Sequence, residues 1–582
     1  MSAFRQALDL LPGVHPEPPE VPGYTDYERL LPALEAAMWA QPDAGRVAHY
    51  QAYSREMEAA VPPDIAARRH RIVVVVPVAD RPRQLAVCID SLAAWQAAYA
   101  YAGGISLLVV EDSLDPRNRA AHRDLLAGIA GLDTHYLGVD EQHALLTSLE
   151  KDLPGRIFPF VGDDWRREMG HKGASVTRNI AMLWLSAQAI ERPLFHFIDS
   201  DQAFHVDVGA EHPRYMLNYY HHLDRLFRMH DISVLTGKVV GDPPVSPAVM
   251  AGTLLADVIR IAEEAAPRDA AACGFHGDAP PLEHGAYHDM ASMFGLDNRA
   301  DAWRYACPLE GPHSYADALD ELGGRLLHFF DGEHPTRLTP FSYQPVEESL
   351  APARTVYTGN YVMNSEGLGH AIPFAPMKLR MAGPTLGRLL QASLGERFVQ
   401  AHLPLLHQRI ESGSGRSEFR PGVSRQAGQV DLSGEYERQF LGDWVLFSVA
   451  ELVAQGYPAD VGAEGIARAL ERAEQCLLDG YAETRRRVMQ RLERLRELLD
   501  SPAMPWQGGQ AMRSAEAKLR AFLESVQRNF AAESPAVVRL SDTAFRGLWK
   551  QRLGTALLGF DAATREWERL LESRRDAAAW ER

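Results

Sequence analysis

The chain is poor in cysteine, with four in 582 residues. Cys88, Cys273, Cys307 and Cys476 show no C-x-x-C spacing, so we expect reduced thiols and no zinc bound through these cysteines. The sequence also lacks any run of ~18 apolar residues, and this predicts that no segment spans a membrane. Because its first residues lack the continuous apolar stretch of a secretory signal, we expect a cytoplasmic protein.

Positive charge is in the minority. Lysine and arginine total 60 against 77 aspartates and glutamates, which gives a net charge of −17. This balance argues against a nucleic-acid-binding protein, although a local basic pocket can still bind phosphate. A chain of this length exceeds one compact core, so we expect two or three domains.

The composition and the spacing of apolar residues change along the chain, and these changes suggest three regions. Residues 1–68 carry helical patterning after a proline-rich start and form an N-terminal helical extension. Residues 69–425 form the main domain, with an insertion at about 245–355. Residues 426–582 have apolar positions at helical spacing and form a C-terminal α-helical domain. One stripe of these positions suits a packing face, with self-association into a homo-oligomer as one use: Val488, Leu492, Leu495, Leu498 and Leu499.

Short β-branched runs alternate with amphipathic segments in the main domain. Apolar strands are expected at 72–76, 105–110, 134–137 and 195–198, with helices at 85–98 and 179–189 between them. This alternation predicts an α/β fold with a largely parallel, doubly wound sheet. Further strand or turn character is expected at 232–236, 355–363 and 372–376.

Carboxylates follow three of these predicted strands. They are Asp80, then Glu111 with Asp112, and then Asp199 with Asp201. Each alone is equally well explained as a helix cap. The carboxyl ends of parallel strands meet at one rim, however, where open α/β folds bind ligands. The D-x-D spacing of Asp199 and Asp201 suits a hard divalent cation, which can hold a diphosphate.

Two basic or imidazole-bearing segments complement these acids. Lys172 and Arg178 flank Gly173 just before a predicted helix, an arrangement suited to an anion. His407 follows another apolar run and can complete a metal shell, with Arg409 beside it. A solvated lysine and a structural histidine remain the alternatives for these two positions.

These segments together resemble the GT-A glycosyltransferases, in the retaining branch typified by glucosyl-3-phosphoglycerate synthase and mannosylglycerate synthase. The resemblance begins with Val73–Asp80 and Val109–Asp112 and includes Lys172, Gly173, Arg178 and Phe197–Asp201. It continues through Thr358–Tyr361, Pro373–Pro376 and Leu406–Arg409. Over about residues 70–415 it implies a Rossmann-like GT-A fold. It also implies a UDP- or GDP-sugar donor, a hydroxyl acceptor of unknown identity, and Mg²⁺ or Mn²⁺.

The resemblance also implies residue roles. It makes Asp201 and His407 metal ligands, with Asp199 in or near the same shell. The donor would be held by Pro77, Val78, Asp80, Glu111, Asp112, Lys172, Arg178, Asp199 and Ser200. The acceptor would be held by Gly359, Asn360, Tyr361 and Arg409. It identifies no catalytic base.

The sequence departs from the family in two segments. Inverting enzymes usually carry a carboxylate base after the acceptor loop, but Met377–Gly387 contains no acid, and this favours retention. The insertion is rich in histidine, and His284 and His288 lie four residues apart. Because no clear third ligand accompanies that pair, we expect no zinc there and interpret the insertion as a lid or acceptor-shaping subdomain. The insertion's histidines are His276, His284, His288, His313, His328 and His334.

Two other functions remain open. A sugar nucleotidyltransferase would use a similar sheet, but such enzymes normally open with a glycine-rich loop, and Pro77–Pro82 contains no glycine. A non-catalytic scaffold of the same fold would bind nucleotide sugars without turnover.

Overall fold

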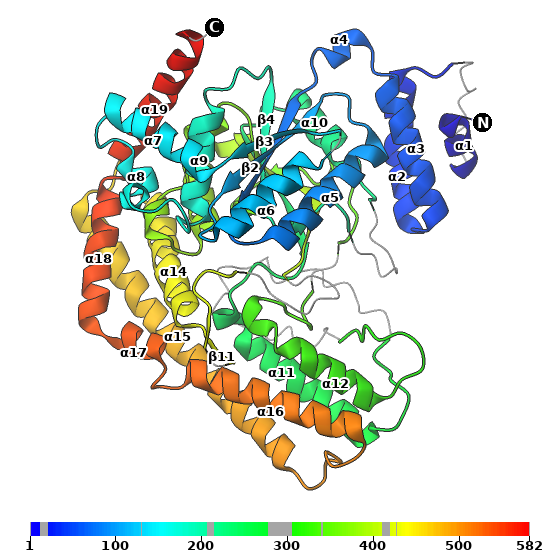
Figure 1. Ribbon diagram of the computed structural model, residues 1–582, viewed down its shortest axis with the longest axis vertical. Helices are drawn as coiled ribbons and strands as arrows, with labels where there is room; N and C mark the ends of the chain where they lie inside the picture. Colours follow the sequence, from blue (N-terminus) through cyan, green and yellow to red (C-terminus); the bar gives the residue numbers. More distant parts are fainter. Residues whose placement is uncertain are drawn as a thin grey trace.

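The computed structural model describes residues 2–11, 21–129, 131–206, 215–276, 305–338, 341–409, 419–426 and 428–580. Within these ranges, nine strands form one central sheet (Figure 1). Its order is β3-β2-β1-β4-β8-β6-β9-β5, with β7 pairing with β9 at the side of this path. His284 and His288 lie outside the described residues.

Most of this sheet is parallel. Four strands on one side run in the same direction: β1 (Arg71–Val78), β2 (Ile105–Glu111), β3 (Asp133–Leu137) and β4 (Pro193–Ile198). On the other side β6 (Val234–Gly241) and β9 (Phe398–His407) are parallel to each other. The antiparallel strands are β8 (Asn360–Met363), β5 (Gln202–Ala203) and β7 (Ala351–Pro352). The predicted α/β fold with a largely parallel sheet is confirmed.

Helices cover both faces of the sheet. Two hydrophobic cores lie against the sheet, one on each face, and successive residues of β1 point into different cores. Val74 and Val76 belong to the first core, and Val73 and Val75 belong to the second. A strand buried on both faces has to be apolar throughout, which explains the run Ile72–Val76. The first core includes α1 (Ala3–Leu10), α2 (Tyr24–Ala40), α3 (Ala44–Ala59), α5 (Pro82–Tyr99), α6 (Pro116–Ala127) and α10 (Tyr219–Met229). The second includes α7 (Val139–Asp152), α8 (Phe158–Val161), α9 (Ala174–Leu185), α13 (Ala382–Leu394) and α19 (Phe560–Trp580).

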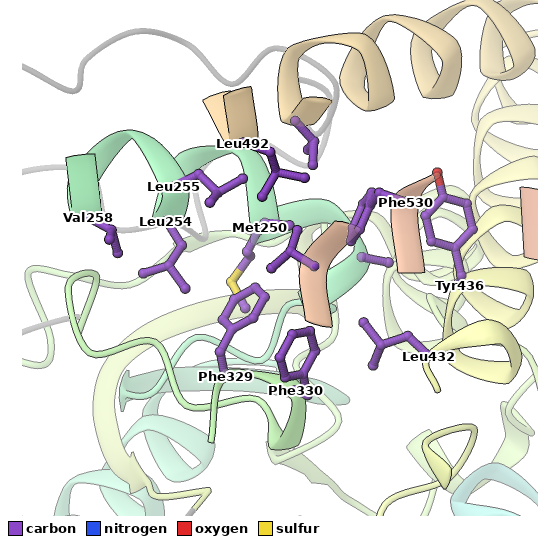
Figure 2. Packing of buried hydrophobic residues seen from close by; sticks show 14 of the residues in the cluster. Met250, Leu254, Leu255, Val258, Phe329, Phe330, Leu432, Tyr436, Leu492 and Phe530 are labelled. Carbon is purple, nitrogen blue, oxygen red and sulfur yellow. The ribbon is translucent and has the colours of Figure 1, made fainter. Parts of the chain in front are cut away.

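A separate helical layer lies below the sheet in Figure 1. It combines α11 (Pro247–Ala265) and α12 (Tyr315–Leu326) with α14 (Ser433–Val453), α15 (Ala463–Asp500) and α16 (Gln510–Phe530), and these helices share one hydrophobic core. Figure 2 shows Leu255 of α11 close to Leu492 of α15 within this core. The described helices of the 245–355 segment therefore pack with the C-terminal helices. The layer continues into α17 (Pro535–Ser541) and α18 (Thr543–Leu558).

The apolar stripe of α15 packs within its own chain. Its five residues are at most 4% exposed, because they pack inside the helical layer of their own chain. The stripe is therefore a packing face of the helical layer, as its spacing suggested, and these five residues offer no surface to a second copy.

Three predicted elements differ in the structure. The helix expected at 179–189 is α9, which begins earlier, at Ala174. Of the strand expected at 355–363, only β8 pairs in the sheet. The segment 372–376 contributes no strand and leads into a short 3₁₀ turn, Ala375–Met377, because Pro373 and Pro376 cannot donate ladder hydrogen bonds. No helix among the described residues has the length and apolar character needed to cross a membrane.

Candidate functional site

A cavity of about 390 Å³ opens at the carboxyl edge of the parallel strands. Pro77, Val78 and Ala79 at the end of β1 form one wall, and Asp112 follows β2. The loop after β4 contributes Asp199, Ser200 and Asp201. The rest of the lining comes from later segments: Arg81, His171, Gly173, Ala174, Lys378, Arg409, Phe419, Pro421, Gly422 and Arg438. The strand-end acids of β2 and β4 therefore converge as the parallel sheet predicts.

Asp201 lies at the base of this cavity, and its side chain is 1% exposed. Its Oδ2 accepts hydrogen bonds from Arg81 Nη1 at 3.0 Å and Arg409 Nη1 at 2.8 Å. Burial opposes ionisation, but Arg409, His407 and Arg81 outweigh it and hold the pKa of Asp201 well below its ordinary value. Oδ1 has no hydrogen-bond partner among the described residues. Asp201 is therefore a buried charged carboxylate with one oxygen that no described residue binds.

His407 is brought to Asp201 by strand pairing. Asp201 directly precedes β5, and the first residue of β5, Gln202, pairs with His407 at the end of β9. The imidazole Nε2 lies 3.6 Å from Asp201 Oδ2. Nδ1 lies 2.6 Å from the carbonyl oxygen of Asp242, and because a carbonyl only accepts, Nδ1 carries the proton. Nε2 is therefore the ring nitrogen that faces Asp201.

A divalent cation fits this pair of residues. Among the described residues the buried Asp201 Oδ1 has no hydrogen-bond partner, and an oriented imidazole lies 3.6 Å from Oδ2 of the same carboxylate. Donation of the other ring N–H to a backbone carbonyl is also the usual way that a protein fixes a metal-ligating histidine. Carboxylate oxygen and imidazole nitrogen together suit Mg²⁺, Mn²⁺ or a similar ion.

Asp199 is held differently from Asp201. Its Oδ1 accepts a hydrogen bond from Arg178, which also donates to the carbonyl of Thr358 at 3.0 Å. Arg178 is buried on α9, whereas the Asp199 side chain is 34% exposed. A Cβ on Gly359 would lie 3.2 Å from Asp199 Oδ2 and 2.7 Å from Gln202 Nε2, so a larger residue there would have to displace the Gln202 amide beside Asp199. Arg178 thus positions Asp199 and does not line the cavity itself.

Lys172 and Asp112 bind each other. Asp112 Oδ1 accepts from Lys172 Nζ at 3.0 Å and from its backbone N–H at 2.7 Å, while Oδ2 accepts from Gly173 N at 3.0 Å. Lys172 Nζ also donates to the carbonyls of Glu111 at 3.2 Å and Met169 at 2.5 Å. An ammonium has three N–H donors, so Lys172 is saturated within the protein. Gly173 has φ +96° and positions this backbone N–H directly before α9.

Asp80 and Glu111 turn away from the cavity. Asp80 accepts from the backbone N–H groups of Leu114 and Asp115, both at 3.1 Å, and from Asn118 and His171 side chains. Glu111 is fully buried, and its oxygens are bound by two backbone N–H groups, His122 and Tyr136. Burial raises the pKa of Glu111, but these hydrogen bonds, led by that from His122, outweigh burial and bring it to about 2. Both acids brace the loops that shape the rim.

Two of the predicted acceptor residues are built into the sheet. Asn360 is fully buried in β8 and donates to the carbonyls of Lys238 at 2.7 Å and Leu403 at 2.8 Å. Tyr361 is also buried and stacks on Phe197 with ring centroids 4.9 Å apart. Neither lines the cavity. Of the predicted acceptor set, Arg409 does line it, and Gly359 lies beside Asp199.

Sequence reasoning missed most of the cations around this cavity. Arg81, Lys378 and Arg438 line it, and Arg420 adjoins it between Phe419 and Pro421. Burial lowers the pKa of Arg420 to about 9, and although Glu435 opposes the shift, the like charges of Arg409 and Arg380 add to it. Since Asp112 and Asp199 are already paired with Lys172 and Arg178, the region is rich in positive charge despite an acidic chain. Of the arginines and lysines that line the cavity, Arg409 is the one that the sequence predicted.

An aromatic pair also went unpredicted. The rings of His171 and Phe419 stack with centroids 4.0 Å apart at the cavity wall, and His171 has φ +51°. His171 Nε2 donates to Asp80 Oδ2 at 2.7 Å, which fixes the ring. Asp80 therefore acts on the cavity through His171.

Comparison with known proteins gives only distant similarity. No protein-family model matches the chain, and no curated protein matches it. A mannosyltransferase from Pyrobaculum calidifontis, solved in complex with GDP-Man and Mn²⁺, is 10% identical with a TM-score of 0.32, over 86% of this chain and 99% of that one. Mannosyl-3-phosphoglycerate synthase from Rubrobacter xylanophilus is 13% identical with a TM-score of 0.25, over 62% of this chain and 77% of that one. Similarity this low assigns no activity to the chain.

Proposed function

We propose that this protein is a glycosyltransferase that depends on a divalent cation and moves a sugar from a nucleoside-diphosphate sugar to a hydroxyl acceptor, with retention. One observation carries the proposal. The buried Asp201 carboxylate, with one oxygen free and His407 Nε2 facing it, lies at the base of a cavity otherwise rich in arginine and lysine. A carboxylate and an imidazole suit a cation, and the surrounding cations suit a diphosphate.

The cation would be held by Asp201 and His407. When bound, it acts as a Lewis acid that offsets the charge developing on the departing diphosphate. The carbonyl of Asp242 holds the Nδ1 side of His407, so Nε2 is the ring nitrogen that would ligate the cation. Arg178 keeps Asp199 at the cavity mouth, next to the cation position.

The diphosphate would lie against Arg81, Arg409 and Lys378. All three line the cavity, and α9 begins there with Ala174, so its backbone N–H groups add to the anion site. This assignment replaces Lys172, whose ammonium is already saturated, as the phosphate-binding lysine. The nucleoside would occupy the wall formed by Pro77, Val78 and Asp112.

The distribution of acids supports retention. The carboxylates among the described lining residues are Asp112, Asp199 and Asp201. Asp112 is bound to Lys172, Asp199 to Arg178, and Asp201 to two arginines. An inverting reaction needs a carboxylate able to accept the acceptor's proton, and each of these three is already engaged by cations.

Isothermal titration calorimetry tests the proposal. UDP- and GDP-sugars are titrated into the full chain with and without Mn²⁺, and we expect binding that requires the metal. Asp201→Asn should abolish it, while Asp90→Asn, which changes an exposed acid on α5, should not. Indifference of the wild-type chain to every nucleotide sugar in the presence of metal would contradict the proposal.

Turnover separates the two other functions. Transfer to an added hydroxyl acceptor, with the product anomer read by NMR, supports the transferase and its stereochemistry. Release of pyrophosphate from a nucleoside triphosphate and a sugar phosphate would instead identify a nucleotidyltransferase. Metal-dependent binding with no turnover on any acceptor would identify a scaffold.

A further inference from the structure

A second group of metal-ligating side chains lies away from the cavity, where the helical layer joins the loop before α12. Cys273 and His276 follow the 3₁₀ turn Ala266–Arg268 after α11, and Cys307 and His313 precede α12. One ligand atom from each of the four lies within 4.8 Å of all the others. Two thiols and two imidazoles at one point are a donor set typical of zinc.

The distances inside the group approach those of a tetrahedral site. His276 Nε2 lies 3.0 Å from His313 Nε2, and Cys307 Sγ lies 3.4 Å from His313 Nε2. With Zn–N bonds of about 2.0–2.1 Å and Zn–S bonds of about 2.3 Å, the edges of a tetrahedron are about 3.3–3.8 Å. Only small shifts would therefore be needed to admit the ion.

The ligands are also oriented by their backbone surroundings. His313 Nδ1 donates to the carbonyl of Gly311 at 2.8 Å, which leaves Nε2 with its lone pair toward the group. The backbone N–H of Phe275 donates to Cys273 Sγ at 3.5 Å, and that of Leu309 hydrogen-bonds the Cys307 thiol. Each sulfur is thus bonded by the N–H two residues further along, a contact that would stabilise a bound thiolate.

The two loops are tied together by main-chain hydrogen bonds. Cys273 N donates to the carbonyl of His313 at 3.0 Å, and Cys307 N donates to that of Phe275 at 2.9 Å. Directly after His313, Ser314 caps α12 in a capping box with Asp317. Main-chain hydrogen bonds and the helix cap therefore hold the backbone of all four residues in place, so that their side chains meet at one point.

We propose that Cys273, His276, Cys307 and His313 bind a structural Zn²⁺. Four protein ligands leave no open position for substrate, so the role is structural rather than catalytic. The soft sulfur donors select zinc over Mg²⁺ and Mn²⁺, which separates this ion from the one proposed at Asp201. Zinc here would join the end of α11 to the start of α12. Two of the four cysteines thereby gain the role that their spacing in the sequence did not suggest.

Metal analysis of the full chain tests this site. We expect the protein, purified without chelator, to contain ~1 equivalent of zinc per chain when measured by inductively coupled plasma mass spectrometry. Cys307→Ser and His313→Ala should lose it. Cys476→Ser, which changes an exposed cysteine elsewhere, and Asp201→Asn should keep it. Zinc that survives Cys307→Ser, or that is lost with Asp201→Asn, would overturn the assignment.

Cobalt exchange of the wild-type chain avoids reliance on variants that fail to fold. Co²⁺ in a Cys₂His₂ site should give the visible bands of tetrahedral cobalt and the near-ultraviolet thiolate-to-cobalt band, and added Zn²⁺ should remove both. A reduced wild-type chain that takes up neither zinc nor cobalt in this way would overturn the proposal. So would a Cys273–Cys307 disulfide in the freshly isolated protein.

Discussion

Two buried aspartates, one at the sheet rim and one in the helical layer, carry opposite pKa shifts. At the rim, burial opposes the charge of Asp201, but Arg409, His407 and Arg81 hold its pKa well below the ordinary value. In the helical layer Asp443 of α14 accepts hydrogen bonds from Gln439 and Tyr481, both at 2.7 Å. Burial dominates there and raises its pKa to about 7.

The difference lies in the neighbouring cations, because both carboxylates are fully buried. At Asp443 the hydrogen bonds from Tyr481 and Gln439 and the charge of Arg380 leave most of the desolvation cost in place. At Asp201 two arginines and His407 overcome it. The sheet rim therefore keeps a charged acid where a ligand can reach it. The helical layer uses an acid of the same type as a hydrogen-bonding core residue.

Lys172→Met should convert a rim acid into one that resembles Asp443, and we expect the largest effect here. It removes the cation that is bonded to buried Asp112, the only one found among the described residues. Breaking a buried ion pair by removing one partner costs about 3–5 kcal/mol of stability. Chemical denaturation against wild type measures this loss. Lys151→Met, at an exposed lysine of α7, is the matched control and should be close to neutral.

The double variant Asp112→Asn/Lys172→Met shows whether charge imbalance causes the loss. It removes both charges and keeps an acceptor for Gly173 N–H, so a large part of the stability should return. A Lys172→Met protein with unchanged stability and weakened donor binding would instead restore Lys172 as a phosphate ligand.

Asp201→Asn should cost about 10²–10³-fold in sugar transfer, comparable to the loss of one electrostatic group from a catalytic site. The amide lacks the negative charge that would hold the cation beside His407. Initial rates over a range of Mn²⁺ concentrations measure the effect, and melting of the variant checks that it folds. Asp443→Asn, in the other region, should transfer sugar at the wild-type rate. Equal losses in both variants would remove the contrast between the two acids.

Local pattern predicted the sheet well and the rim only in part. The apolar runs at 72–76 and 105–110 lie within β1 and β2 because strands covered by helices on both faces have to be apolar. The pattern did not show that α11 and α12 would join the C-terminal helices. Their common core is a matter of long-range packing, which periodicity within one segment does not encode.

The same limit explains why only some of the site residues could be predicted from the sequence. The position of Asp112, Asp199 and Asp201 at strand ends predicted that they meet at one cavity. It could not show that Lys172 forms an ion pair with Asp112, or that Arg178 forms one with Asp199. The zinc ligands were missed because each loop supplies only one cysteine and one histidine. Cys273 and His276 have C-x-x-H spacing, a signal that a search for C-x-x-C passes over.

Asp443→Asn should change the pH dependence of the free energy of unfolding by about 1–3 kcal/mol in total. This is less than the full pKa shift would give at ~1.4 kcal/mol for each pKa unit. As pH rises from about 4 to about 7, the unfolded aspartate ionises while the folded one stays neutral, so wild type loses stability in this window. The asparagine variant lacks this loss. Urea unfolding at pH 4 and pH 8 should therefore show the variant gaining on wild type at the higher pH. A pH-independent difference would contradict the raised pKa.

Arg409→Lys should have the smallest effect, about a tenfold weaker affinity for the donor, equivalent to ~1.4 kcal/mol. Lysine keeps the positive charge near Asp201, so the fold and the ionised carboxylate should survive. It lacks the planar fork with which arginine can contact the carboxylate and a phosphate at once. Calorimetry with the nucleoside diphosphate and Mn²⁺ measures the change, and Arg472→Lys, at an exposed arginine of α15, is the control. If positive charge alone were enough at the rim, Arg409→Lys would bind the nucleoside diphosphate as tightly as wild type does. The geometry of the arginines would then not contribute to the difference between the rim and the helical layer.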